Sequence, residues 1–520
     1  MKLRDVNTMD IGGAIRAGCR TMASVFNADD DDVPFFGSQV WPDPHLAFSS
    51  VHSESHVPGR HLNALLTAES LGFPIDEAAV EKHARAAFFS YGGPLALPLN
   101  RERIDGPLEN FRPHNVREGF HALYALARFR DSERAREVAE ASISTINRLW
   151  DPDRGWVEDR IARQHGVNFH HQGTFITGLG RAIGPLVKYY RATGYGPSLE
   201  LAILLKEKAV ADYFLADGSY DTERFGSHTH STTCVMSSLA QLADLLNDAP
   251  LMARVYSFYS GGLWEIRDEL GWVIESSAAD APPDRGEANN TGDILETALI
   301  LGRWGYTEAY DDAERILRGH LLPSQLRDIS WIEEPANPAD EDGRRDVAKR
   351  HWGAFGFPAP YGHRPVGLPR VAFNMDIVGG AVASLCEAYR EATRRDSAGH
   401  RVNLLFDHET AAVKAESPYT KERLAVTLKE PGPLFVRIPA WADPAGIQVT
   451  GLARPPLHAD RYLLLSDPPV GRRLTFSLRL AAGELLLRHR TRDIRVRLLG
   501  DQVTAVENFG QDLTFFDPIL

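Results

Sequence analysis

The sequence predicts a mainly helical chain with an added β domain: an (α/α)6 barrel over residues 1–395, followed by a β-sandwich over residues 396–520. Two observations predict this class. A helix–turn–helix pattern occurs five times before a sixth helical segment, and the pattern changes to short alternating apolar stretches after Asp396. Hydrophobic residues make up 43% of the chain, which is enough to bury a large core.

The helical hairpins are marked by short turns that contain Gly, Asn, Asp or Pro, residues that stop and restart helices. The turns span residues 70–74, 129–133, 193–197, 247–250 and 303–307, and the sixth helical segment spans 376–394. Apolar residues such as Ile183, Leu186 and Val187 follow the helical period, but the opposite faces are only partly polar. Helices of this kind need cover on two sides, which favours a double-layered ring over the alternative, an open α-solenoid.

The last 120 or so residues carry strand signals. Short apolar or alternating segments, separated by Pro, Gly and Asp, span residues 424–429, 434–439, 462–466, 474–480, 494–499 and 503–507. We interpret this region as a support for the barrel, with an independent carbohydrate-binding role as the alternative.

Charge and cysteine content exclude several classes of protein. The chain has 57 Lys and Arg against 70 Asp and Glu, a formal charge of −13, which is the wrong balance for a nucleic-acid partner. The three cysteines, Cys19, Cys234 and Cys386, are too few and scattered for a disulfide framework, and no window is apolar enough for a membrane span. These features predict a cytoplasmic protein with a small-molecule substrate and no membrane partner; a homodimer is an open expectation.

Histidines gather in the loops between the predicted helices. They occur in the segments 43–61, 112–118, 164–172, 226–231 and 351–365, and together they predict a polar cavity at one end of the ring. His228 and His230, with His170 and His171, offer imidazole ligands, but their spacing matches no known helical zinc motif. The prediction is therefore a site without metal or other cofactor.

Carboxylates give the stronger signal. Glu275 and Glu287 lie on the loop before the helix that starts near Asp293. Cleavage of a glycosidic bond needs one protonated carboxylic acid and a second group that acts as base or nucleophile, and two Glu on one loop meet that need. The alternative is that Glu287 only stabilises the N-terminus of the next helix.

Four segments resemble the β-L-arabinofuranosidases of glycoside hydrolase family 127 and its relatives. The resemblance runs through NFHHQGTFITGLG, GSHTHS, the helix after Glu287 and LFVRIPAWADPAGIQVTG, and it covers residues 168–451. Arg437, Ile438, Pro439 and Trp441 carry its most specific part. It implies an (α/α)6 barrel followed by a β-sandwich, and hydrolysis of a glycosidic bond.

The chain departs from that family at its metal site. Members of the family hold zinc with one Glu and three cysteines, one of which is the nucleophile. In this sequence Asn289 stands at the position of one cysteine, and Asn374, Met375 and Asp376 stand where a Cys-Cys pair is expected. Amide and thioether groups do not replace a thiolate, so the zinc and cysteine mechanism is not expected.

The resemblance also implies sugar-binding positions. It places Glu275 near the position of a general acid, and His228 and Arg181 at sugar-contacting positions. Arg181 together with Arg364 would bind a carboxylate, which makes a uronate sugar one predicted substrate.

These observations predict a glycosidase that acts on the ends of small oligosaccharides by carboxylate acid/base catalysis without metal. The predicted catalytic residues are Glu275, Glu287, Asp293 and His228, and the predicted substrate-binding residues are His170, His171, Arg181, His230, Trp352, Tyr361, His363 and Arg364. Two alternatives stay open. One is a lyase that cleaves next to a uronate with a Tyr or His base and a group that neutralises the carboxylate, for which Tyr361, His363, His228 and Arg364 are available. The other is a sugar-binding protein without activity.

Overall fold

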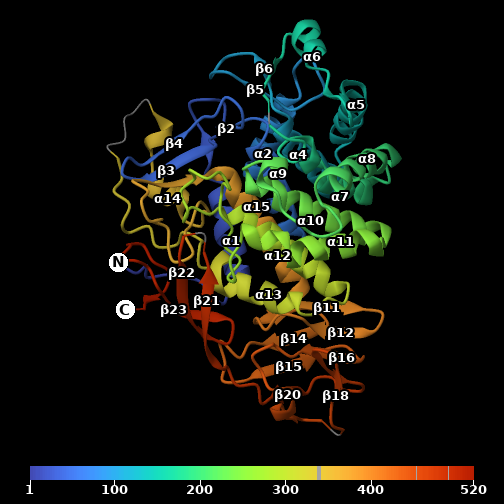
Figure 1. Ribbon diagram of the computed structural model, residues 1–520, viewed down its shortest axis with the longest axis vertical. Helices are drawn as coiled ribbons and strands as arrows, with labels where there is room; N and C mark the ends of the chain where they lie inside the picture. The colour runs from blue at the N-terminus through green and yellow to red at the C-terminus, as the bar shows by residue number, and fades with distance from the viewer. Residues whose placement is uncertain (172, 336–340, 453, 490, 520) are drawn as a thin grey trace.

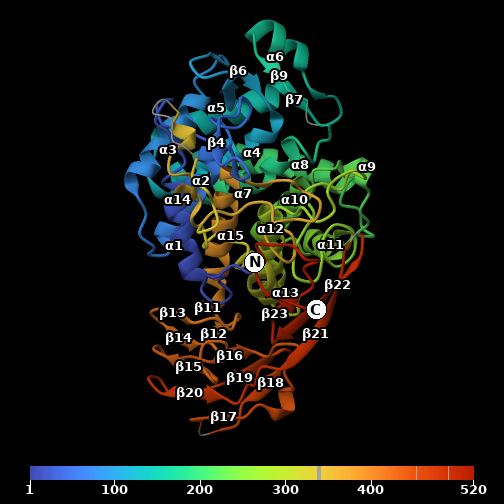
Figure 2. The ribbon, with the colours of Figure 1, turned by 90° about the vertical axis from the view of Figure 1, so that its left-hand side faces the viewer.

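The computed structural model describes residues 1–171, 173–335, 341–452, 454–489 and 491–519. Helices fill the upper and central parts of the molecule, and two β-sheets lie beneath them (Figure 1). A third sheet lies along one side, and Figure 2 shows it from a perpendicular direction. No helix in the described ranges combines the length and the apolar character that a membrane crossing requires.

Six helices contact one another in cyclic order. Each helix contacts the next one in the order α2, α4, α7, α10, α12 and α15, and α15 contacts α2. Their bounds are Val57–Ser70 (α2), Val116–Phe129 (α4), Ile183–Thr193 (α7), Thr229–Leu246 (α10), Ala288–Arg303 (α12) and Met375–Ala392 (α15). This contact order agrees with the ring predicted from the repeated hairpins.

A second layer of helices lies outside this ring. Each of the first five inner helices packs against the helix that follows it: α3 (Glu77–Ser90), α5 (Glu133–Leu149), α8 (Gly196–Asp212), α11 (Ala249–Ser260) and α13 (Ala309–Ile316). All five predicted turns lie between these pairs. The sixth outer helix is α1 (Ile11–Met22), which packs against α15 from the other end of the chain. The repeat pattern did not predict this pairing, because α15 runs directly into a strand.

Local chemistry explains the ends of these helices. Ser132 caps α5 by accepting a hydrogen bond from the backbone N–H of Ala135, and Asp248 caps α11 in the same way through Leu251. Gly194 and Asn247 adopt left-handed conformations that end α7 and α10. The turns therefore form where the sequence offers cap residues.

The β domain contains two five-stranded sheets. One sheet has the order β11 (Thr393–Asp396), β12 (Gly399–Val402), β16 (Leu434–Arg437), β19 (Tyr462–Leu465) and β18 (Leu457–Ala459). The other has the order β13 (His408–Glu409), β14 (Val413–Glu416), β15 (Leu424–Leu428), β20 (Arg473–Phe476) and β17 (Val449–Thr450). Apolar side chains of both sheets, including Val426, Val436 and Phe476, form one buried cluster. Four of the predicted strand segments overlap β15, β16, β19 and β20.

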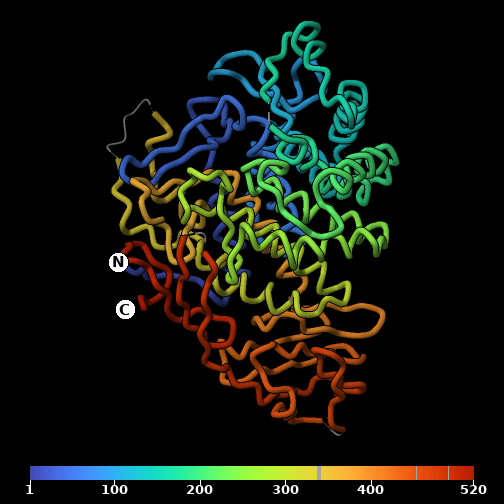
Figure 3. The backbone as a smooth tube through the Cα atoms, viewed as in Figure 1, coloured from blue at the N-terminus to red at the C-terminus, as the bar shows by residue number. Residues whose placement is uncertain are grey.

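The end of the chain belongs to the helical part instead. It forms a separate sheet of β21 (Ala482–Arg488), β22 (Asp493–Leu499), β23 (Gln502–Val506) and β24 (Asp517–Pro518). Its buried side chains, such as Ile494 and Val503, join the core of the helices. The chain also returns to its beginning, since Lys2 pairs with Thr514 and the two termini lie close together (Figure 3). The predicted division at residue 395 therefore does not describe this last segment.

Buried charges connect the two five-stranded sheets to the helices. Arg437 on β16 forms ion pairs with Asp311 and Glu314 on α13, and Trp441 donates from its indole nitrogen to Asp501 over 2.8 Å. The residues that carry the most specific part of the resemblance thus have a structural role. They fix the two five-stranded sheets beneath the helices.

Two small sheets lie among the loops at the end of the helices that faces away from the β domain. One contains β3 (Gly37–Trp41), β4 (His45–Ala47) and β10 (Val371–Asn374), and the other contains β5 (Leu99–Arg101), β6 (Leu108–Phe111) and β9 (Asn168–Phe169). These sheets bring segments from distant parts of the sequence around the N-terminal ends of the inner helices.

Candidate active site

A cavity of about 580 Å³ opens among the N-terminal ends of the inner helices. His56, His228, Glu287 and Asn374, which directly precede α2, α10, α12 and α15, all line it. Helix N-termini carry partial positive charge, so the cavity is a favourable place for polar and anionic groups.

Glu287 lies in the wall of this cavity and is only 6% exposed. It occupies the N-cap position of α12, but its side chain makes no capping hydrogen bond. One of its oxygens instead accepts a hydrogen bond from Asn289 Nδ2 over 2.9 Å. Burial, and then the negative charge of Asp376, raise the pKa of Glu287 to about 7 despite the opposing effect of Arg60. Glu287 can therefore hold a proton near neutral pH, and the alternative of a simple helix cap does not describe it.

Asp376 is the second carboxyl group of the cavity wall and behaves in the opposite way. It lies 3.2 Å from His56 Nε2 and 3.4 Å from Arg60 Nε. Burial alone raises its pKa, but Arg60 and the hydrogen bond from His56 outweigh that effect and lower the pKa to about 2. Asp376 is thus ionised at neutral pH, where about half of the Glu287 carboxyl groups are protonated.

A buried ion cluster holds the floor of the cavity. Glu118 on α4 accepts from Arg60, Arg117 and Arg181 at 3.1, 2.9 and 3.1 Å. Although Glu118 is fully buried, these guanidinium groups hold its pKa well below the usual range. The cluster ties α2 and α4 to the segment before α7 and fixes Arg60 beside Asp376.

Histidine rings form a continuous row along the wall. His56 stacks on His114 with ring centroids 5.4 Å apart, His114 meets His228 at 5.3 Å, and His228 meets His230 at 5.8 Å. Burial, followed by the nearby Arg181, lowers the pKa of His114 well below its usual value and that of His228 to about 3. Neutral imidazoles both donate and accept hydrogen bonds, which suits the hydroxyl groups of a sugar.

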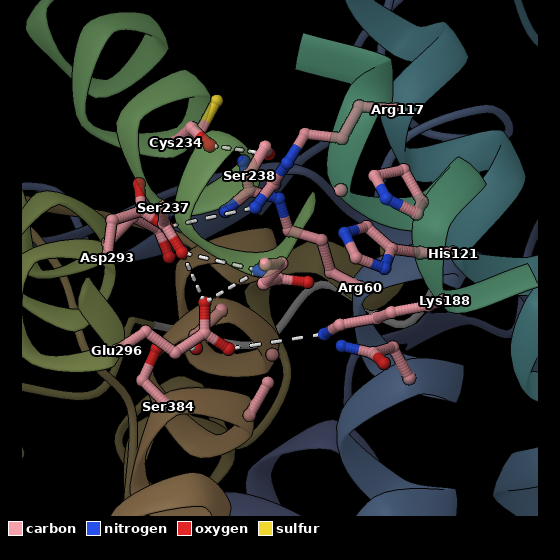
Figure 4. A pocket seen from close by; sticks show the side chains of 18 of the residues that line it. Arg60, Arg117, His121, Lys188, Cys234, Ser237, Ser238, Asp293, Glu296 and Ser384 are labelled. Carbon is pink, nitrogen blue, oxygen red and sulfur yellow. Dashed lines mark hydrogen bonds and ion pairs between the residues drawn. The ribbon is translucent and has the colours of Figure 1, made fainter. Parts of the chain in front are cut away.

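A small polar chamber lies beneath the floor (Figure 4). In that view Asp293 and Glu296 face Arg60, Arg117 and Lys188 across it. Its volume is about 30 Å³, room for about one water molecule and not for a sugar. Burial raises the pKa of Asp293 to about 7, against the effect of Arg117.

Glu275 lies at the rim of the main cavity. Its side chain is 24% exposed and pairs with Arg285 over 3.0 Å. Arg285 in turn lies over the ring of Phe357 at 4.0 Å. Glu275 therefore faces the cavity with its charge already compensated.

The structure brings five of the predicted residues together in the cavity wall, namely His171, His228, His230, Glu275 and Glu287. Two others lie below it, since Asp293 faces the small chamber and the fully buried Arg181 binds Glu118. His170 does not line the cavity; its backbone N–H donates to the carbonyl of Phe111.

Four predicted substrate-binding residues lie elsewhere. Tyr361 donates to Asp284, and His363 packs against Phe515 with ring centroids 4.9 Å apart. Arg364 lies 4.5 Å from the ring of Trp41, and Trp352 stacks with Arg20 at 4.9 Å. The predicted pair of Arg181 and Arg364 therefore does not form a carboxylate site, because each arginine is engaged in a different part of the molecule.

Sequence reasoning missed several residues of the site. They are His52, His56, Arg60, Arg112, His114, Glu118 and Asp376. The histidine-rich segments 43–61 and 112–118 did point to the right loops. The sequence presents Asp376 only as part of the replacement for a missing cysteine pair, although its position at the start of a helix is a usable signal.

His228, His230 and Glu287 form the group of side chains in the described chain that could hold a metal ion, with ligand atoms within 4.8 Å of one another. The charges around it disfavour a divalent cation, since Arg60, Arg181 and Arg117 all act on His230. The thiolate set of family 127 also does not fit. All three cysteines are buried, and none of them lines the cavity.

Comparisons with known proteins show which solved structures have a similar fold. No protein-family model and no curated protein matches the sequence. A solved family 127 β-arabinofuranosidase is similar with a TM-score of 0.59 at 12% identity, over 96% of this chain and 83% of that one. A solved glycoside hydrolase has a TM-score of 0.55 at 13% identity, and the match covers 90% of this chain and 83% of that one. The family 127 β-L-arabinofuranosidase of Geobacillus stearothermophilus T6 has a TM-score of 0.55 at 15% identity, and the match covers 95% of this chain and 80% of that one. The predicted resemblance thus holds at the level of the fold.

Proposed function

We propose that the protein is a glycoside hydrolase that removes sugars from the ends of small oligosaccharides, with Glu287 as proton donor and Asp376 as its ionised partner. One observation carries this proposal. Two buried carboxyl groups line the same cavity, and their surroundings move their pKa values in opposite directions, to about 7 and about 2. A protonated acid beside an ionised carboxylate is the arrangement that glycoside cleavage requires.

The proposed reaction uses residues of this chain alone. Glu287 donates its proton to the glycosidic oxygen as the bond to the sugar carbon breaks, and the alcohol leaves. The positive charge that develops on the sugar ring is stabilised by the carboxylate of Asp376, which serves as base for water or as nucleophile. Arg60 and His56 hold Asp376 in place and keep it ionised.

The shape of the site supports action on chain ends. The cavity has the volume of a small-molecule site, and its floor is closed by the ion cluster around Glu118. The chamber below is too small to admit a further sugar. A terminal residue would fill the cavity while the rest of the oligosaccharide extends past the rim, where Glu275 lies.

The fold of the solved glycoside hydrolases agrees with this proposal, although at 12–15% identity it bears on architecture only. The lyase alternative is weaker, because Tyr361 and His363 lie outside the cavity wall. His228 does line the cavity, but its pKa is lowered to about 3, which makes it a weak base. A non-catalytic sugar-binding protein is the remaining alternative.

Hydrolysis of a panel of 4-nitrophenyl glycosides, in both anomeric forms, tests the proposal. We expect release of nitrophenol by the wild type, near-complete loss in Asp376→Asn and a smaller loss in Glu275→Gln. In Glu287→Gln the loss should be larger on alkyl glycosides than on these activated ones, because nitrophenolate leaves without a proton. New absorbance of an unsaturated uronate in the products would indicate a lyase. Wild-type protein that binds glycans but cleaves none would support the non-catalytic alternative.

A further inference from the structure

Arg112 is a cavity-lining cation with no carboxylate partner among the residues that the structure describes. It follows β6 and precedes the short helical turn Pro113–Asn115, so the backbone around it is fixed. Its Nη1 donates to His52 Nε2 over 3.1 Å, and its Nε is buried without a hydrogen-bond partner. A buried donor without a partner is unusual and calls for an explanation.

The neighbouring arginines are different. Arg60 contacts Glu118 and Asp376, Arg117 contacts Glu118 and Asp293, and Arg181 contacts Glu118. Each of these guanidinium groups has at least one carboxylate within 4.0 Å. Arg112 is thus the exception in a cluster where cations are otherwise paired.

The contact with His52 does not compensate the charge of Arg112. A guanidinium only donates, so His52 Nε2 accepts, and a neutral His52 carries its proton on Nδ1, 3.1 Å from Ser49 Oγ. Burial first, and then the charges of His56 and Arg112, hold the pKa of His52 well below its usual range. The ring therefore stays neutral and orients Arg112 without balancing its charge.

Leaving a partly buried cation unpaired is costly, and an anionic ligand would supply the missing charge. Burial and the nearby charge of Arg181 lower the pKa of Arg112, and no carboxylate acts on it. Because Glu287 is about half protonated near neutral pH, it compensates only part of the positive charge that Arg112 adds to the cavity.

We propose that Arg112 binds the carboxylate of a uronate sugar at the end of the substrate chain. This inference rests on the proposed function and adds the substrate class. A planar guanidinium matches a planar carboxylate through two parallel hydrogen bonds, which makes it more selective than a point charge. Arg112 is not one of the two arginines, Arg181 and Arg364, that the sequence predicts to bind a carboxylate. Those two contact Glu118 and Trp41 instead.

Ligand-induced stabilisation tests the inference without requiring catalysis. Thermal unfolding would be followed with D-glucuronate, D-galacturonate and D-mannuronate, and with D-glucose, D-galactose and D-mannose at matched ionic strength. We expect at least one uronate to raise the Tm of the wild type by about 2 °C or more at saturation, and its neutral counterpart to have little effect. Glucose 6-sulfate is tested in the same way, as a sugar with a different anionic group. Stabilisation by this sulfate ester but by no uronate would overturn the carboxylate assignment.

Three variants give the assignment its controls. Arg112→Gln keeps a donor for His52 but removes the charge, and we expect it to abolish the uronate effect while unfolding at or above the Tm of the ligand-free wild type. Arg112→Lys should retain part of the effect. Arg364→Gln, which alters an arginine outside the cavity wall, should behave as the wild type. Equal stabilisation of the wild type and Arg112→Gln by uronates, or no stabilisation by any of the three, would overturn the inference.

Kinetics separate this inference from the proposed function. On matched aryl uronides and neutral aryl glycosides we expect the wild type to prefer the uronide, and Arg112→Gln to lose about 100-fold in kcat/KM on the uronide and less than about threefold on the neutral glycoside. Similar losses on both would contradict a carboxylate role. Uronate binding through Arg112 without hydrolysis of any glycoside would leave the inference standing and remove the hydrolase.

Discussion

The imidazole of His230 lies 3.6 Å from the carboxyl of Glu287, measured from Nδ1 to Oε1. The other nitrogen of the same ring lies 3.4 Å from Asp293 Oδ2, so His230 stands between the main cavity and the chamber beneath it. Burial, with the charges of Arg60, Arg181 and Arg117, keeps this ring neutral and its pKa well below the usual range. A neutral ring beside Glu287 leaves the proton on the carboxyl group, where the proposed reaction needs it.

Replacement of the proton donor should abolish most of the activity. In Glu287→Gln, the amide retains the shape of the side chain but has no acidic proton, so we expect kcat to fall by about 10²–10⁴. Steady-state hydrolysis of an oligosaccharide or an alkyl glycoside, whose leaving group needs the proton, measures this loss. Unchanged circular dichroism would show that the variant is folded, and a loss of less than tenfold would contradict the assignment.

The pH dependence should show an alkaline limb near pH 7. Glu287 must be protonated to act, and its pKa is raised to about 7, so kcat/KM should fall about tenfold per pH unit above that value. Glu275 also raises the pKa of Glu287. In Glu275→Gln the limb should therefore move to lower pH, and a shift to higher pH would argue against a direct charge effect.

Asp376→Asn should lose activity, and its free energy of unfolding should depend less on acidic pH than that of the wild type. The pKa of Asp376 is about 2 in the folded protein, below its usual value of 3.8, so its contribution to stability is present above about pH 4 and is lost as the pH falls toward 2. Urea unfolding at pH 5 and pH 2 should show this loss, about 2 kcal/mol, in the wild type and not in the variant. The variant should also be less stable at neutral pH, because Arg60 and His56 lose their partner.

Removal of metal should leave the activity unchanged. The ligand group of His228, His230 and Glu287 lies among arginines, which repel a divalent cation. We expect the same kcat before and after dialysis against a chelator, and no gain on addition of zinc. Loss of activity that zinc alone restores would assign these three residues to a metal site and would remove Glu287 as a free acid.

Close packing of α2 and α4 should make Gly59 intolerant of any side chain. A Cβ at Gly59 would lie 1.8 Å from the backbone oxygen of Glu118, which would force the two helices apart. We expect Gly59→Ala to lower the free energy of unfolding by about 3 kcal/mol and to weaken activity through the ion cluster of Glu118. Gly196→Ala, where a Cβ would meet no atom within 4 Å, is the matched control and should be neutral or stabilising.

Much of the helical architecture could be predicted from the sequence, because helix periodicity and turn chemistry are local. The turns at 70–74 and 247–250 lie where the pattern placed them, and Asn247 ends α10 as expected of a helix stop. The pairing of α1 with α15 and the attachment of the last sheet to the helical core depend on contacts between distant segments, which no local pattern encodes.

The residues of the candidate site also fall into those that the sequence predicts and those that only the structure reveals. The sequence by itself identified Glu275, Glu287 and the histidine-rich loops, since carboxylates and imidazoles before helices are visible as residue types. Only the tertiary structure decided that Asp376 lines the same cavity as Glu287, that Asp293 lies below the floor and that Arg112 faces the cavity without a carboxylate partner among the described residues. The reason is physical: the protonation state and the pairing of a charge are set by burial and by neighbours a few ångströms away, and those neighbours come from helices far apart in the chain.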